Sequence, residues 1–260
     1  MSALLRRFSP WLAGLGLFLG WEAVCRVFDV PEAILPTPSA SLAALWQYWG
    51  GVWMNAAQTL YTTIIGFALA VVVGLALGVA VGAYPTLYRA INPILIGFNT
   101  IPKVAVVPIL IIWFGIGTVP AIITAFLISF FPIVVNVATG IATMEPELED
   151  VLRSLGARKR DILWKVGLPR AMPYFFASLK ISITLAFVGS IISETVASNS
   201  GIGYLMLSAS SSFRVPLVFA GLLVIAALGI IMYAGAALIE RRFTFWATRG
   251  VDGGGYATGG

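Results

Sequence analysis

The residues of this chain that could take part in chemistry are few, and they form no recognisable catalytic set. The sequence has no His and a single Cys, Cys25, so it offers no His-based acid–base pair, no internal disulfide and no plausible zinc site. It contains no phosphate-binding GxxxxGK[ST] pattern and so cannot cradle ATP in that way. We therefore expect no catalytic residue, no metal and no cofactor bound by this chain.

Two ionisable residues lie within or at the end of long apolar stretches, where a charge is costly and usually faces a bundle interior or water. The first, Lys103, follows Ile101 and Pro102, and the proline is expected to break or kink a helix there. A broken helix frees backbone groups that must line a cavity or be buried in protein. An ammonium there could attract an anionic substrate, or Lys103 could snorkel or pair structurally.

The second ionisable residue is Glu194, which ends an apolar stretch within the polar segment SIISETVASNSG. This segment could act as an external gate or contact a partner protein, and the alternative is a simply hydrated loop. We take five residues as candidates for a translocation path: Pro102, Lys103, Ser193, Glu194 and Asn199.

The composition indicates the solvent in which these residues lie. Of the 260 residues, 59% are hydrophobic and 10% are charged, and the mean hydropathy is +0.96. A soluble domain is usually about one-quarter charged, so this chain cannot cover a globular surface with polar groups. A membrane bundle is therefore expected. The net charge of +5 fits the Lys/Arg excess of cytoplasmic membrane loops better than nucleic-acid binding.

Stretches of about 20 apolar residues predict a polytopic, all-α bundle with about six transmembrane helices. Their approximate bounds are 10–28, 56–83, 91–113, 119–141, 172–193 and 215–239. The first is interpreted as an uncleaved span with Cys25 as a packing residue, because no small-residue cleavage site follows it. Residues 1–250 would form a single domain, and the Gly-rich segment 251–260 a disordered tail.

The distribution of Lys and Arg predicts the orientation of the bundle. With the N-terminus inside, the outer face receives only Arg26 and Arg214, and every other Lys and Arg except Lys103 falls on the inner face. Both termini and the loop 142–171 are therefore expected to be cytoplasmic.

Two local patterns lie near the predicted outer face. Pro38 and Ser39 are typical of a helix start, and the aromatic residues that follow predict a short helix at the membrane interface. Glu22 and Arg26 are four residues apart in the favourable order, which predicts a structural ion pair.

Glycines recur at every fourth position of the second span. Gly74, Gly78 and Gly82 form two successive GxxxG steps, which indicate close approach of a neighbouring helix. That neighbour could belong to the same bundle or to a second copy across a dimer seam.

The segment 149–169, EDVLRSLGARKRDILWKVGLP, is the only long charged stretch and must lie in a solvent-facing loop. Pro146 suits the first turn of a helix whose apolar residues, at 148, 151, 152 and 155, form one ridge. Gly156 occupies the place where a left-handed residue ends a helix. A second short helix would follow and stop at Gly167 and Pro169.

An apolar ridge that faces water needs a partner groove, and a helix lying in a groove is a common mode of recognition. Two other functions stay open for this segment. Arg158, Lys159 and Arg160 could bind lipid headgroups. DNA recognition is geometrically possible, but both ends of the segment are tethered to the bilayer.

The segment resembles the cytoplasmic coupling loop, or EAA loop, of ATP-binding-cassette importer permeases. That pattern reads Glu-Ala-Ala, three residues, Gly, nine residues, then Ile-x-Leu-Pro. At the same spacing this chain has Asp150-Val151-Leu152, Gly156 and Val166-x-Leu168-Pro169. It departs from the pattern at three places. Asp150 is a shorter acid than Glu, Val151 and Leu152 are larger than the two alanines, and Val166 replaces Ile.

Further motifs resemble the nitrate, sulfonate and taurine branch of these permeases: LPTPSA at 35–40, IPKVAVVPILIIWFGIG at 101–117, RSLGA at 153–157 and SNSGIGYLM at 198–206. The resemblance implies the type I importer-permease fold in a bacterial inner membrane. It also implies that ten residues couple the chain to an ATPase: Glu149, Asp150, Val151, Leu152, Leu155, Gly156, Ala157, Arg158, Leu168 and Pro169.

The resemblance further implies partners and a substrate class. A second permease copy would complete a homodimer, two ATPase subunits would use ATP and Mg²⁺, and a periplasmic or lipid-anchored binding protein would deliver the solute. That solute would be small and anionic, like a sulfonate, taurine or nitrate, although relatives also carry pyrimidine vitamin precursors, riboflavin and aromatic carboxylates. The alternative class is an ion-coupled carrier or channel that uses Glu22, Lys103 and Glu194.

Overall fold

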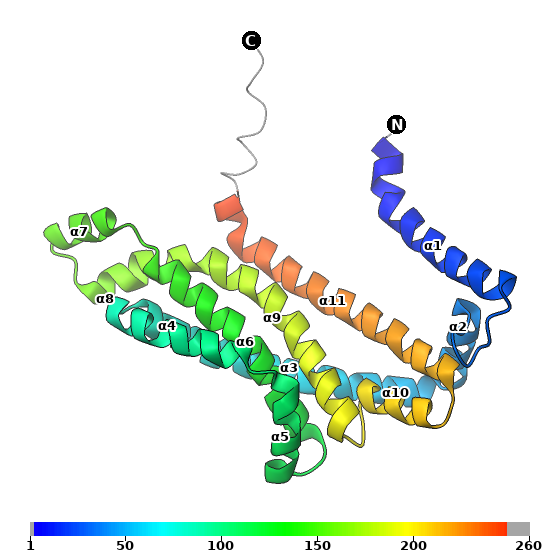
Figure 1. Cartoon of the computed structure of the whole chain (residues 1–260). Helices are drawn as coiled ribbons and strands as arrows, with labels where there is room; N and C mark the ends of the chain where they lie inside the picture. Colours follow the sequence, from blue (N-terminus) through cyan, green and yellow to red (C-terminus); the bar gives the residue numbers. More distant parts are fainter. Residues whose placement is uncertain (1–2, 249–260) are drawn as a thin grey trace.

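A computed structural model describes residues 3–248, a range that contains helices and connections but no strand (Figure 1). The long helices are α1 (Ala3–Val27), α3 (Trp49–Gly82), α6 (Thr118–Ala142), α9 (Leu168–Ala197) and α11 (Val215–Thr248). The shorter ones are α2 (Pro38–Gln47), α4 (Pro85–Thr100), α5 (Val107–Phe114), α7 (Pro146–Ser154), α8 (Lys159–Ile162) and α10 (Ile202–Ser211). The predicted all-α class is confirmed, and the predicted tail 251–260 lies outside the described residues.

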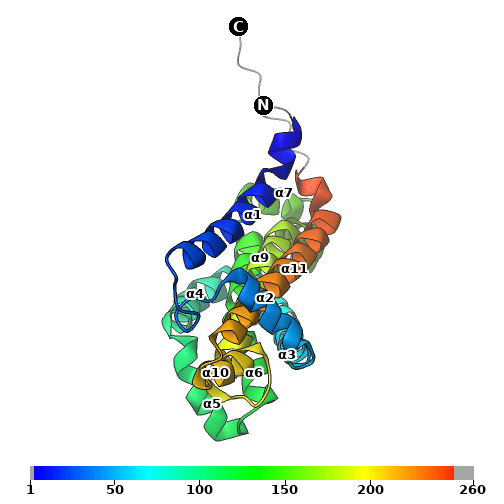
Figure 2. The same ribbon diagram turned by 90° about the vertical axis from the view of Figure 1, so that its right-hand side faces the viewer.

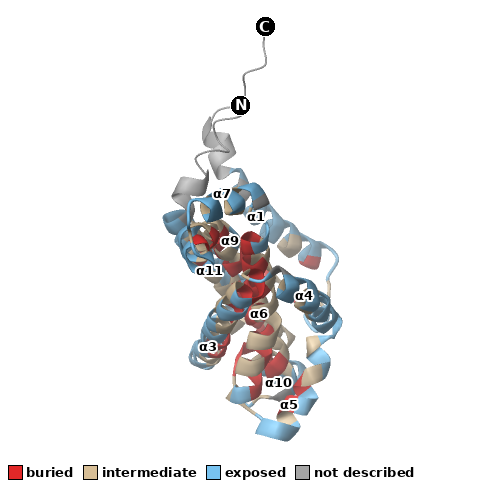
Figure 3. Ribbon diagram, turned by 90° about the vertical axis from the view of Figure 1, so that its left-hand side faces the viewer, coloured by how far each residue is buried: buried red, intermediate tan, exposed pale blue. Residues whose placement is uncertain are grey.

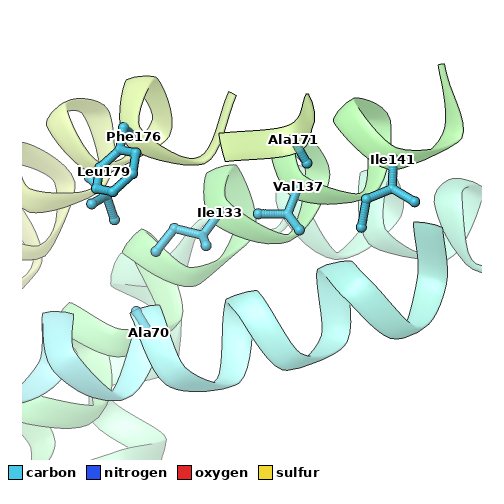
Figure 4. Close-up of a cluster of buried hydrophobic side chains, with 7 residues drawn as sticks. All are labelled: Ala70, Ile133, Val137, Ile141, Ala171, Phe176 and Leu179. Atoms are coloured by element: carbon cyan, nitrogen blue, oxygen red, sulfur yellow. The ribbon is translucent and has the colours of Figure 1, made fainter. Parts of the chain in front are cut away.

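Helix α6 lies at the centre of the bundle, between α3 and α9 (Figures 1 and 4). One apolar cluster joins the three helices, with Ala70 from α3 and Ala171 among the residues from α9. The α6 side chains in this cluster are Ile133, Val137 and Ile141. Figure 3 shows buried residues along α6, α9 and α10, whereas α1 and α4 are mostly exposed. This cluster therefore forms a layer of three helices, and a second apolar cluster joins α3 to α10 and α11.

The glycines of α3 allow this close packing. A methyl group added at Gly74 would lie 2.9 Å from Ile133 Cβ, and one added at Gly78 would lie 2.7 Å from Val137 Cβ. Gly82 likewise approaches the Ala138 carbonyl oxygen. The neighbour predicted for the GxxxG steps is thus α6 of the same chain, and the alternative of a dimer seam at these glycines is wrong.

The predicted third span is broken near its middle, as the proline indicated. After α4, a short 3₁₀ turn η1 (Lys103–Val106) leads into α5, and the two halves of the span meet at 78°. Ile101 has extended dihedral angles, φ −67° and ψ 124°, which the residue before a proline prefers. Pro102 also lacks the N–H that would continue the helix. The predicted break is confirmed.

In the part of the chain that the structure describes, four helices are long and apolar enough to cross a membrane, and the bent pair α4–α5 makes a fifth if it counts as one span. They correspond to five of the six predicted spans. The predicted first span, α1, is a helix of 25 residues and is not among the spans found in the described part of the chain, so its passage through the membrane stays a prediction.

The predicted stop before the fifth span is wrong. Instead, α8, a π-helical turn η2 (Leu163–Gly167) and α9 form one continuous helix, of which Lys159–Val196 make up 38 residues. The Leu168 N–H donates to the Leu163 carbonyl oxygen five residues back, and this wider turn leads into Pro169 at the start of α9. Pro169 lies inside this continuous helix, and the π-helical turn just before it shifts the hydrogen-bonding spacing, so the missing N–H of the proline does not end the helix. Gly167 keeps ordinary helical angles, φ −62° and ψ −50°.

The short helix predicted after Pro38 is confirmed as α2. Thr37 caps it, because its hydroxyl accepts a hydrogen bond of 3.1 Å from the Ala40 N–H. The predicted ion pair is also present, with Arg26 Nη2 2.6 Å from Glu22 Oε1. The same carboxylate accepts hydrogen bonds from the Ser39 N–H and hydroxyl, so it ties α1 to the start of α2. Cys25 is buried, as expected of a packing residue.

Different elements lie at the two ends of the bundle. In Figure 2 the beginning of α1, the end of α11 and helix α7 lie toward one end, whereas α5 and α10 lie toward the other. This arrangement agrees with the prediction that the termini and the loop 142–171 share one side of the membrane. Their cytoplasmic orientation stays a prediction.

Candidate functional site

The segment at 145–169 projects from one end of the bundle as α7, a tight turn and α8 (Figure 1). The turn at the end of α7 has a defined geometry. The Ala157 N–H donates to the Leu152 carbonyl oxygen at 3.0 Å, and the Gly156 N–H to that of Arg153 at 2.9 Å. This pair of bonds is the Schellman motif, which places a left-handed residue after the helix. Gly156 has φ +85°, so the predicted left-handed end of the helix is confirmed.

Two charged contacts attach this segment to the bundle. Glu145 Oε1, just before α7, lies 3.0 Å from Arg170 Nη2 in the first turn of α9. The Lys159 ammonium at the start of α8 lies 4.3 Å from the centre of the Tyr84 ring, which precedes α4. The segment is thus joined both to the long α8–α9 helix and to the α3–α4 turn.

A cavity of about 210 Å³ separates α7 from the ends of α3 and α6. Its lining includes Asp150, Glu149 and Arg153 from α7, Lys159 from α8, and Gly82 at the end of α3. Glu149 and Arg153 also form an ion pair one helical turn apart. Asp150, the position at which the family pattern has Glu, therefore faces the bundle's own end.

The apolar ridge of α7 divides between two surroundings. Leu148 and Leu152 are half-buried, and Leu152 lines a pocket of about 230 Å³ between α7 and α8. Val151 and Leu155 are largely exposed, with exposed fractions of 55% and 79%, and Leu155 also borders the rim of that pocket. These two side chains form the unpaired part of the ridge and are its available docking surface.

The other predicted coupling residues lie around this surface or farther away. Arg158 is exposed and occupies the N-cap of α8, and Ala157 is half-buried in the turn. Leu168 and Pro169 begin α9, on the far side of the π-helical turn. The structure therefore groups Glu149 to Arg158 in one projecting segment and sets Leu168 and Pro169 apart from it.

At the opposite end of the bundle, Glu194 lies in a buried polar cluster between α3, α9 and α10. Its side chain is 1% exposed in this chain, so the alternative of a hydrated loop is wrong for this residue. The Thr59 hydroxyl donates to Oε2 at 2.8 Å, the Thr62 hydroxyl to Oε1 at 3.3 Å, and the Gly203 N–H to Oε2 at 3.2 Å. The Ser190 hydroxyl completes the cluster with a 2.9 Å bond to Thr62 Oγ1.

This cluster fixes the beginning of α10. The first N–H groups of a helix have no partners within it. Here the Gly201 N–H donates to Asn55 Oδ1 at 2.7 Å, and the Ile202 N–H to Thr59 Oγ1 at 2.9 Å. The Glu194 carboxylate accepts the third, from Gly203. Gly201 has φ +104°, and a methyl group there would overlap the Glu194 carboxylate, so glycine is required.

The five predicted path residues do not meet in one place. Pro102 and Lys103 lie at the break between α4 and α5, where Pro102 is exposed and Lys103 is half-buried. Ser193 and Glu194 are buried in α9, and the Ser193 hydroxyl has no hydrogen-bond partner in the described part of the chain. Asn199 is exposed in the connection to α10.

The partners of Glu194 were not predicted from the sequence. The cluster takes Asn55, Thr59 and Thr62 from one face of α3, at spacings of four and three residues. Hydroxyl groups recurring on one face of an apolar span were the available signal, because such groups seek hydrogen bonds between helices.

We expect Glu194→Ala to lower the stability of the bundle by about 2 kcal/mol, because it leaves the buried Thr59 and Gly203 donors without their acceptor. Glu194→Gln keeps one carbonyl oxygen and should cost less than half as much. The measurement is the thermal midpoint in detergent, with the exposed Glu32→Ala as control. A midpoint unchanged in Glu194→Ala would show that the cluster contributes nothing.

The apolar helices, the broken span and the projecting α7 segment together define a polytopic transport permease. Residues 70–245 match the family described as "Binding-protein-dependent transport system inner membrane component", and the chain belongs to this family. The predicted class, an ABC importer permease, is confirmed. The family is one of transport permeases rather than enzymes.

Curated relatives match over most of their length. A riboflavin transport system permease protein from Chloroflexus aurantiacus is 33% identical, covering 88% of this chain and 87% of the relative. A formylaminopyrimidine transport permease protein from Halalkalibacterium halodurans is 29% identical, covering 92% and 95%. A taurine transport system permease protein from Escherichia coli is 28% identical, covering 87% and 85%.

A solved structure supports the fold. A chain of the MetNI methionine ABC transporter, in an inward-facing conformation, superimposes with a TM-score of 0.60. The match covers 77% of this chain and 97% of the other, at 22% sequence identity. The two chains therefore share an arrangement of helices.

Proposed function

We propose that this chain is the membrane subunit of an ATP-driven importer and that α7 transmits motion from a separate ATPase. The observation that carries the proposal is the exposed pair Val151 and Leu155 on a helix held rigidly by the turn at Gly156. Val151 and Leu155 lie one helical turn apart on the same face of α7, and this apolar pair, on a helix outside the bundle, is what a groove on an ATPase subunit would cover.

The remaining parts of the proposal follow from the family. A second copy of the chain completes the pathway as a homodimer, two ATPase subunits bind ATP and Mg²⁺, and a binding protein delivers the solute. The chain itself binds no cofactor, and it spans the bacterial inner membrane several times with both termini in the cytoplasm. Residues Pro102 and Lys103 at the break, and Ser193, Glu194 and Asn199 near α10, contribute to the path.

The substrate proposed from the sequence is a small anion such as a sulfonate, taurine or nitrate. The names of the relatives cover taurine, aliphatic sulfonates, riboflavin and formylaminopyrimidine, so they favour a small organic solute without selecting one. Lys103 is the feature of this chain that favours an anion among them.

The test is purification of the tagged chain from its own membranes, followed by an assay for ATP hydrolysis in the eluate. The unaltered chain is expected to carry ATPase activity with it. Leu155→Asp should weaken that association roughly 10- to 100-fold, since burying one leucine contributes about 1.5–3 kcal/mol. Ile34→Asp, at a 71% exposed position near α2, is the control and should retain the activity.

Two results would contradict the proposal. One is solute uptake by liposomes that contain the purified chain alone, without ATP, which would indicate an ion-coupled carrier. The other is equal ATPase activity in the eluates of Leu155→Asp and Ile34→Asp, which would place the ATPase contact elsewhere.

A further inference from the structure

A cavity of about 230 Å³ lies beside the break in the third span, between α4, η1 and α6. Its walls are almost entirely apolar. Six side chains supply them: Phe98, Ile101, Val106, Leu127, Phe130 and Phe131. The exceptions are Asn99 and Lys103, so the cavity combines an apolar body with a single cationic group.

The Lys103 ammonium is held in position by the end of α4. Its Nζ donates to the Asn99 carbonyl oxygen at 2.5 Å and to Asn99 Oδ1 at 3.1 Å. The last carbonyl groups of a helix lack partners within it, and a cation is favourable there. An ammonium has three donors, and these bonds use two. The third has no partner in the described part of the chain and is available to a ligand.

The size and walls of the cavity restrict what it can hold. A dry apolar cavity of about 150 Å³ accommodates benzene in another protein. A cavity of about 230 Å³ therefore holds one six-membered ring with a small head group. Nitrate or sulfate would leave the apolar walls unused and lose most of its hydration, which is costly for an ion with one partner. An uncharged ring would leave the third donor of Lys103 unused.

The surroundings of the cavity give a ligand access. Irregular backbone at membrane depth occurs only where it is buried in protein or lines a water-filled space. Pro102 and Val104 at the break are exposed in this chain. The break therefore adjoins another subunit or an aqueous path, and the latter allows an anion to reach Lys103.

We propose that this cavity binds an organic monoanion whose ring-sized apolar body packs against Phe98, Phe130 and Phe131 and whose sulfonate or carboxylate accepts a hydrogen bond from Lys103. The inference rests on the proposed transport function and narrows its substrate class. It selects aromatic sulfonates and carboxylates over nitrate and over the smaller zwitterion taurine.

The test is calorimetric titration of the purified full chain in nanodiscs with benzenesulfonate as the probe. Lys103→Met should weaken binding roughly 10- to 100-fold, the range expected for one hydrogen bond to a charged group. Lys103→Arg keeps the charge and should bind within a few fold of the unaltered chain. Lys165→Met removes a charge from an exposed position of η2 and should have no effect.

Ligand comparisons with the unaltered chain test the cavity without any variant. Benzyl alcohol has the ring without the charge, and sulfate and nitrate have charge without the ring. Each is expected to bind at least tenfold more weakly than benzenesulfonate. Leu127→Trp fills the cavity and leaves Lys103 in place, so it should also abolish binding of the probe.

The proposal is overturned if the unaltered chain does not bind benzenesulfonate, if sulfate or benzyl alcohol binds as tightly, or if folded Lys103→Met or Leu127→Trp binds normally. The titration needs neither ATP nor an ATPase. A negative titration would therefore overturn the ligand site without affecting the proposed ATPase association through Leu155. Loss of that association would in turn leave the titration a valid test of the ligand site.

Discussion

Replacing Gly78 with leucine is expected to lower the free energy of unfolding by about 3 kcal/mol or more, the upper range for overpacking a core. The α-carbon of Gly78 lies so close to α6 that even a methyl group would come within 2.7 Å of Val137 Cβ and 3.1 Å of the Val134 carbonyl oxygen. Both contacts involve parts of the chain that cannot rotate away. The two helices must separate, and the apolar cluster that they share opens.

The measurement for Gly78→Leu is the thermal midpoint of the purified chain, which should fall by roughly 6–12 °C for this loss of stability. Gly235→Leu in α11 is the matched control, because a Cβ added there meets nothing within 4 Å. Its midpoint should equal that of the unaltered chain. Equal midpoints for the two variants would mean that α3 and α6 do not pack as described.

Replacing Gly156 with valine is expected to abolish coupled uptake while the bundle still folds and inserts. Gly156 has φ +85°, a region that costs a side-chain-bearing residue roughly 1–2 kcal/mol and a β-branched one more. An added Cβ meets nothing within 4 Å, so the effect is on the turn and not on packing. Without the turn, Leu155 no longer has a fixed direction relative to α8.

The experiment compares solute uptake and ATP hydrolysis by the assembled complex in proteoliposomes. Gly156→Asn is the control, because asparagine is among the residues that tolerate left-handed angles, and it should keep most of the uptake. Normal uptake by Gly156→Val would show that the Schellman turn is not required for coupling ATP hydrolysis to transport. A lowered thermal midpoint of Gly156→Val would show instead that the turn stabilises the whole bundle.

The sequence predicted those features that depend on local pattern. The lengths of the apolar stretches predicted the positions of five spans. Pro102 predicted the break, and the spacing around Gly156 predicted the left-handed turn. Each of these follows from a restriction that acts within a few residues, such as the missing N–H of a proline or the lack of a Cβ.

The features that were missed are a turn without a sequence signal and contacts between distant segments. The helix passes through Gly167 and Pro169 because a π-helical turn leads into the proline, and no local pattern in the sequence marks that turn. Glu194 was predicted to end a span in a polar segment, with a gate, a partner contact and a hydrated loop left open, whereas it is hydrogen-bonded in the bundle to Thr59 and Thr62, more than 130 residues earlier. Which face of α3 meets α6 and which meets α10 is decided by packing.

The uninterrupted passage from α8 through η2 to α9 has a mechanical consequence. Lys159 stands beside α7 at one end of this helix, and Glu194 holds α10 at the other. Counted along the helix at 1.5 Å per residue, the two are about 50 Å apart. The helix bends between them (Figure 1), and Pro173 lies within it. The two faces of the bundle are thus joined by one continuous helix, with no loop between the α7 end and the residue that anchors α10.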